Sequence, residues 1–276
     1  MDMFEYRPAN VLADTVKMDG PTSFVGTGDA IRSRAWAYTL GRSGLLSASR
    51  NAREVECVLY ADYETADALR RAADADVQAG TPGTFVACGE WSQRGYVLSS
   101  APGNIHFGRV ELTLTIALLD GAWWRLRTVS LMPGSGSGDA SGLGYNYGYN
   151  HDYTKPQSGG RIDNQSLVAC KPRLVFYGAV TDPYIIIAGN KYQVTGSVAS
   201  GARIEVDGRD MTVKMVTSDG TVTDKFSSAL RGSGEGGGQY IFQPIPPGVS
   251  GVTWDDSFGV DVCWYEEEGE PPWNLS

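Results

Sequence analysis

The sequence has few of the residues that most often bind metals or transfer protons in enzymes. Its 276 residues include only two histidines, His106 and His151, and neither lies in a pattern such as HExxH. The four cysteines are too far apart for a CxxC site: Cys57, Cys88, Cys170 and Cys263. We therefore expect no catalytic residues, no metal site and no cofactor, and we expect the cysteines to be buried thiols in strands.

Positive charge and long apolar runs are also scarce. Lysine and arginine total 23 against 32 aspartate and glutamate residues, which gives a net charge of −9. Surfaces that bind phosphate backbones need clustered basic residues, so this balance argues against specific nucleic-acid binding. No stretch reaches the roughly 18 apolar residues of a membrane span, and the first residues do not form a secretory signal. We expect no membrane partner.

Glycine and aromatic residues are abundant instead. The chain contains 35 glycines, 14 tyrosines and 7 tryptophans, which is typical of turn-rich β structure. Apolar and polar side chains alternate over 31–40, 55–63 and 109–126, which predicts half-buried strands. The segment 41–54 is predicted to be a loop. The expected fold class is therefore mainly β.

One strong helix is predicted over residues 64–79. Alanine, leucine and arginine dominate this segment, and its apolar residues form one stripe. Asp62 or Thr65 can cap its start, and Gly80 can end it. The helix is expected to pack on the sheet of the N-terminal domain.

The composition changes near residue 133. From there to about residue 160 the chain is rich in Gly, Ser, Asn, Asp and Tyr and has too few aliphatic residues for a core. We predict an N-terminal domain at 1–132, a connector at 133–160 and a C-terminal β-sandwich at 161–276. The tyrosines of GLGYNYGYNHDY (142–153) allow three interpretations: an ordered strap, a mobile linker or a platform for a ligand.

Aromatic residues near the C-terminus provide the candidate binding site. Exposed indole and phenol rings can stack on sugar rings. The candidate carbohydrate contacts are Trp254, Trp264, Trp273 and Tyr184. Paired carboxylates could also serve a glycosidase. Asp255 with Asp256, and the run Glu266–Glu268, are the only candidates for that role, and we expect them to be solvated surface groups.

The order of these features resembles the distal tail (Dit) proteins of long-tailed, non-contractile bacteriophages, which form the hub of the tail and baseplate. The resemblance covers almost the whole chain. Its N-terminal part is carried by VECVLYADY (55–63) with the following helix, TPGTFVACGEWSQRGYVLSS (81–100) and ELTLTIALLDGAWWR (111–125). The remainder is carried by the tyrosine-rich connector, LVFYGAVTDPYIIIAG (174–189) and the ending PPGVSGVTWDDSFGVDVCWYEEEGEPPW (246–273).

The resemblance implies a structural virion protein without enzymatic activity. Family members have an N-terminal tail-tube-like β-sandwich or half-barrel with one α-helix, and a C-terminal galectin-like β-sandwich. They form homohexameric rings that join the tail tube protein to the tail tip or tail-associated protein, with a receptor-binding protein as a further partner. DNA passes through the channel without being specifically bound. The expected location is the virion tail tip, assembled in the host bacterial cytoplasm, with Ile31–Leu40 or Val110–Leu118 near a subunit boundary.

Three other functions remain open at the level of the sequence. A carbohydrate-binding module of a host-recognition device would use Trp254, Trp264 or Tyr184. A hydrolase of cell-wall glycan would depend on Asp255 or Asp256. A tail tube or other minor tail protein would normally lack the second β domain.

Overall fold

The computed structural model describes residues 4–26, 28–34, 36–133 and 158–272. It is mainly β, as the composition predicts. The chain divides into two compact units. The first contains residues 1–125 and 267–276, and the second contains residues 126–266. Each unit has its own hydrophobic core.

The first unit is an antiparallel sheet with two helices. Strand β8 connects its two halves, because its beginning pairs with β7 and the remainder pairs with β9. Outward from there, β7 pairs with β1 and β1 with β2, while β9 pairs with β6 and β6 with β3. The elements are β1 (Phe4–Arg7), β2 (Val16–Lys17), β3 (Ser23–Val25), α1 (Gly28–Arg32), β4 (Ala37–Leu40), β5 (Leu45–Ser49), β6 (Arg53–Asp62), α2 (Tyr63–Ala79), β7 (Gly83–Ala87), β8 (Trp91–His106), β9 (Arg109–Leu118) and β10 (Trp123–Leu131), whose end belongs to the second unit.

Gly95 lies where β8 changes partner, opposite both Gly83 of β7 and Leu118 of β9. A Cβ atom at this position would collide with the main-chain oxygen of Ala117. Only glycine allows the strands to approach this closely. Gly95 therefore fixes the point at which the partner of β8 changes from β7 to β9.

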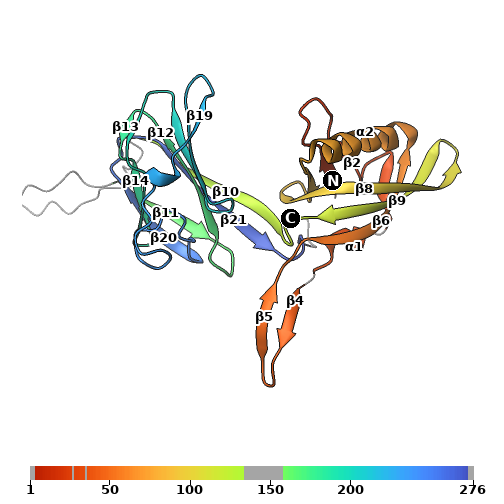
Figure 1. The fold of residues 1–276 in the computed structure, drawn as a ribbon, viewed down its shortest axis with the longest axis horizontal. Coiled ribbons are helices and arrows are strands. Elements are labelled where there is room, and N and C mark those ends of the chain that lie inside the picture. Colours follow the sequence, from red (N-terminus) through yellow and green to blue (C-terminus); the bar gives the residue numbers. More distant parts are fainter. Residues whose placement is uncertain (1–3, 27, 35, 134–157, 273–276) are drawn as a thin grey trace, which may run out of the picture. The chain divides into compact units, whose positions relative to one another are not determined.

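Helix α2 confirms the prediction for residues 64–79. The Asp62 carboxylate accepts a hydrogen bond from the main-chain N–H of Thr65 at 2.8 Å, which caps the first turn. Gly80 ends the helix in the left-handed conformation at φ 64°. The buried stripe includes Leu69 and Ala73 and packs against β6 and β8 (Figure 1).

The cap gives a direct test of this local structure. Asp62→Ala should lower the free energy of unfolding by about 1 kcal/mol, because one main-chain N–H of the first turn loses its acceptor. Urea unfolding of the purified protein, followed by circular dichroism, measures the change. Asp74→Ala, at an exposed position of the same helix, is the matched control. Equal urea midpoints for the Asp62→Ala protein and its control would contradict the role of Asp62 as a helix cap.

The predictions for residues 31–54 are partly wrong. Residues 37–40 form strand β4, as predicted, but every side chain of it is exposed rather than half-buried, and Ile31 lies buried in the short helix α1. The predicted loop contains strand β5, whose one partner among the described strands is β4. The alternation of apolar residues is real, but within the described part of the chain no other strand pairs with this hairpin. Figure 1 shows the hairpin extending away from the remainder of its unit.

The second unit is a sandwich of two antiparallel sheets. One sheet has the order β19-β18-β17-β12-β21-β10, and the other has the order β11-β20-β14-β15. Their facing side chains form one core that includes Phe176, Tyr192 and Trp254. The elements are β11 (Ser158–Asn164), β12 (Lys171–Tyr177), β13 (Val180–Thr181), β14 (Tyr184–Ile187), β15 (Asn190–Gln193), β16 (Ser197–Val198), β17 (Arg203–Asp207), β18 (Thr212–Val216), β19 (Val222–Asp224), η1 (Phe226–Ser228), β20 (Gly248–Trp254) and β21 (Val260–Glu268).

The predicted domain limits, 1–132 and 161–276, remain a prediction. The compact units divide the chain at Leu126 and Glu267, so the C-terminal segment belongs to the first unit. The side chain of Arg32 holds this segment by donating to the main-chain oxygens of Pro271 and Pro272, both at 2.8 Å. Most of the predicted connector, including the tyrosine-rich stretch 142–153, lies outside the described residues.

Candidate functional site

The two tryptophans predicted to contact carbohydrate lie in the core of the second unit. Trp254 is 1% exposed and Trp264 is 4% exposed. The Trp254 indole N–H donates to the main-chain oxygen of Phe258 at 3.3 Å. An aromatic ring that binds a sugar needs a free face, and neither indole has one in this structure. The sequence alternation placed these residues in strands correctly but did not show which face was buried.

Tyr184 is half-buried on β14, and Trp273 lies outside the described residues. The Lys191 ammonium lies 4.5 Å from the centre of the Tyr184 ring, so one face of this ring is already in contact with a cation. Trp254, Trp264 and Tyr184 therefore do not form one open platform. Carbohydrate binding remains a prediction, which a glycan array would test.

The acidic candidates stabilise local structure. The Asp255 carboxylate accepts from the main-chain N–H of Ser257 at 3.1 Å and from its hydroxyl at 2.8 Å, which shapes the turn between β20 and β21. Glu266 is buried and forms an ion pair with Arg127 at 3.5 Å. These roles account for the two carboxylates without a reaction.

The cysteines are free thiols. Cys57, Cys170 and Cys263 are buried, as predicted, and burial raises the pKa of Cys57 to about 12. Cys88 is half-buried and lies between strands β7 and β8. A high thiol pKa disfavours the reactive thiolate, so Cys57 fits a packing role.

Metal-binding groups do not gather anywhere in the described part of the chain: no cluster of three or more His, Cys, Asp or Glu side chains occurs there. His106 lies at the end of β8 next to the exposed ring of Phe107, and His151 is outside the described residues. In the same ranges no helix is long and apolar enough to cross a membrane.

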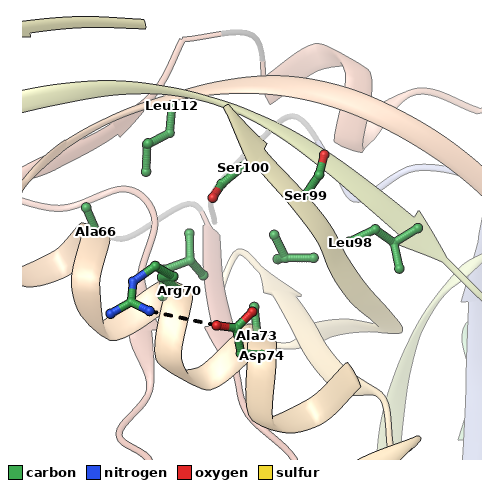
Figure 2. Close-up of a pocket in the computed structure, with 10 residues that line it drawn as sticks. Ala66, Arg70, Ala73, Asp74, Leu98, Ser99, Ser100 and Leu112 are labelled. Atoms are coloured by element: carbon green, nitrogen blue, oxygen red, sulfur yellow. Dashed lines mark ion pairs between the residues drawn. The ribbon is translucent and has the colours of Figure 1, made fainter. Parts of the chain in front are cut away.

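Figure 2 shows a small hollow between α2 and the β8–β9 pair, with a volume of about 40 Å³. Its apolar lining includes Ala66, Ala73 and Leu112. Arg70 and Asp74 lie at its edge as an ion pair, with 3.8 Å between nitrogen and oxygen. The hollow is too small for a substrate of ordinary size, and its two charged groups are paired with each other. We assign it to helix packing.

Exposed apolar side chains of the first unit gather on two hairpins. One is β4–β5, where Leu46 is 73% exposed. The other is the outer part of β8–β9, where Ile105 is 64% exposed and Phe107 is 94% exposed. Hairpins with apolar side chains in solvent are typical of protein interfaces rather than of catalytic clefts. The sequence contains a signal for the first of them, the four-residue loop GRSG (41–44) between two alternating segments.

Comparisons with known proteins identify the fold. No family model and no curated protein matches this sequence. The crystal structure of the SPP1 Dit (gp 19.1) protein, described as a paradigm of the hub adsorption apparatus in phages that infect Gram-positive bacteria, matches with a TM-score of 0.53. The match covers 96% of this chain and 99% of that chain at 12% identity. The chain has the Dit fold.

Two further structures agree with the Dit fold. They are of the phage P2 baseplate in its activated conformation, one with Ca and one with Sr. Their TM-scores are 0.58 and 0.57, and each match covers 98% of this chain and 99% of that chain at 10% identity. The predicted resemblance to Dit and baseplate hub proteins is therefore confirmed at the level of fold.

Proposed function

We propose that this protein is the distal tail hub of a long, non-contractile-tailed bacteriophage. The observation that carries the proposal is that the match to the SPP1 Dit protein covers nearly all of both chains, and so includes both compact units. A tube protein alone would not account for the second unit. The protein is a structural component of the virion and has no enzymatic activity.

In this proposal six copies form a ring through the domain at 1–132, and the galectin-like domain at 161–276 lies on its outside. One face of the ring joins the tail tube protein, and the other joins the tail tip or tail-associated protein and a receptor-binding protein. DNA passes through the central channel. The net charge of −9 supports passage without retention, because acidic walls repel a phosphate backbone. Assembly takes place in the host bacterial cytoplasm.

The exposed hairpins support a ring over a monomer. Strand β4 includes part of the segment Ile31–Leu40, and Val110–Leu118 lies in β9 beside the outer part of β8. We expect both segments near subunit boundaries, because assembly would remove their apolar neighbours from water.

Electron microscopy of the purified protein tests the proposal. Negative-stain images should show six-fold rings with a central hole, and light scattering should give a mass of six chains. A single-chain mass at micromolar concentration, with no rings in the images, would refute it. Glycan-array binding that depends on Tyr184 would instead favour a carbohydrate-binding module.

A further inference from the structure

The hairpin β4–β5, together with Trp36 and Arg50 at its base, forms a feature that we call the arm (residues 36–50). Every residue of its two strands is exposed. Among the residues that the structure describes, the two strands pair with each other alone, in a sheet of their own. An isolated two-stranded hairpin is marginally stable in water. The arm is therefore expected to gain stability from a partner surface.

One face of the arm is apolar. Tyr38 lies opposite Ala48 in the register, and Leu40, two residues further along β4, lies opposite Leu45, so these four share a face. The register shifts between Thr39 and Leu40, which leaves Leu46 as the extra residue of a bulge. Tyr38 is 63% exposed, Leu40 67% and Leu46 73%. The opposite face carries Thr39, Ser47 and Ser49. An amphipathic hairpin with its apolar side in solvent has the pattern of an interface element.

The segment that contains the arm has a charge opposite to that of the remaining chain. Residues 31–53 contain five arginines and no acid. The remainder, with 18 basic and 32 acidic residues, has a net charge of −14. Arg32, Arg50 and Arg53 contact groups of their own unit. Within the described residues, no ion pair joins Arg42 at the arm tip to an acid. The arm thus complements an acidic surface.

The first unit also carries an open groove of about 710 Å³ between segment 10–23 and α2. Its apolar lining includes Leu12, which is 91% exposed, and its carboxylates are Asp14, Asp62 and Glu64. The two basic residues of the lining are Lys17 and Arg71, and Arg71 forms an ion pair with Asp67 at 2.8 Å. The groove therefore combines exposed apolar surface with carboxylates, as the arm combines exposed apolar surface with arginines.

We propose that the arm of one copy docks into this groove on a second copy of the chain, with its apolar face against Leu12 and with Arg42 near Asp14. Arm and groove are different surfaces of one unit, so each copy gives one arm and receives another. Such heterologous contacts close into a ring when the rotation between neighbouring copies closes, as the proposed hub requires. The inference rests on the proposed hub function for the ring and specifies which surfaces hold it together.

Substitutions in the arm test the contact between arm and groove through their effect on assembly. Leu40→Asp and Arg42→Glu should each lower the assembled fraction by at least about tenfold, because each removes an attraction at the interface. Both side chains are exposed, so the thermal unfolding of the monomer should not change. Val249→Asp, at a position 66% exposed in the second unit, is the matched control. The double variant Arg42→Glu with Asp14→Arg should regain assembly, since both charges are reversed.

Disulfide trapping identifies the two surfaces directly. A Leu12→Cys protein and a Gly44→Cys protein, each with Cys88→Ser, should form a cross-linked pair when mixed and oxidised, and neither should do so alone. Rings that persist in both arm variants, without cross-linking, would overturn the pairing and leave the hub function intact. Cross-linking without rings in the unmodified protein would support the pairing and refute the hub. Arm-dependent DNA binding with unchanged assembly would also overturn it.

Discussion

Replacing Trp254 with alanine should lower the free energy of unfolding of the second unit by about 3–5 kcal/mol. The indole is 1% exposed and belongs to the core between the two sheets, with Ile187 and Phe258 in the same cluster. Truncation would leave a cavity among these side chains and remove the donor to the Phe258 main-chain oxygen. Urea unfolding followed by circular dichroism measures the loss.

Val249→Ala on the same strand is the control for this variant. Its side chain is 66% exposed, so the midpoint should change by no more than about 0.5 kcal/mol in free energy. A Trp254→Ala protein of unchanged stability that had lost binding to a glycan would contradict the structure, and it would restore Trp254 as a carbohydrate contact.

Replacing Asp76 with alanine should destabilise the first unit by about 2–4 kcal/mol, because it removes the acceptor of two donors. The carboxylate is 1% exposed on the inner face of α2. It accepts from the Tyr6 hydroxyl at 2.6 Å and from the main-chain N–H of Ala9 at 3.1 Å. This pair of bonds ties β1 and the following loop to the helix. Burial and the neighbouring carboxylate raise the pKa of Tyr6, which keeps its hydroxyl protonated as a donor.

Asp74→Ala is the matched control, two residues earlier on the same helix. Its carboxylate is exposed and contacts only Arg70 among the ion pairs of the described residues, so the loss should stay within about 0.5 kcal/mol. Tyr6→Phe should lie between the two variants, since it removes one of the two bonds. Equal stability of the Asp76 and Asp74 variants would show that the buried bonds contribute nothing.

Local signals were sufficient where short-range chemistry decides the structure. The cap at Asp62 and the glycine at 80 set the limits of α2, which the structure places at Tyr63–Ala79. In β9 the alternation continues from Val110 to Leu118, and every second side chain is buried. The limits of α2 depend on residues that are neighbours in the sequence, and β9 buries one face against a single core. The sequence pattern predicts both kinds of element.

The remaining structure depends on which surface a strand meets, and this is not a local property. Alternation in residues 37–40 is as regular as in β9, yet no further strand of the described ranges pairs with the arm, and its apolar face is in solvent. Trp254 and Trp264 lie in the predicted strands, but only the second sheet shows that their rings point inward. The alternation therefore gave the positions of these two tryptophans in the strands but not the face on which their rings lie, and carbohydrate binding remains a prediction.

The division of the chain between the units has an evolutionary consequence. Residues 126–266 leave and re-enter the first unit through β10 and β21, and these two strands are hydrogen-bonded neighbours. The ends of this segment therefore emerge side by side. A recombination event could exchange the whole segment for another module without a long linker and without interrupting any of the strands β1 to β9. Under the proposed hub function, such an exchange would alter what the tail displays while the first unit is inherited unchanged.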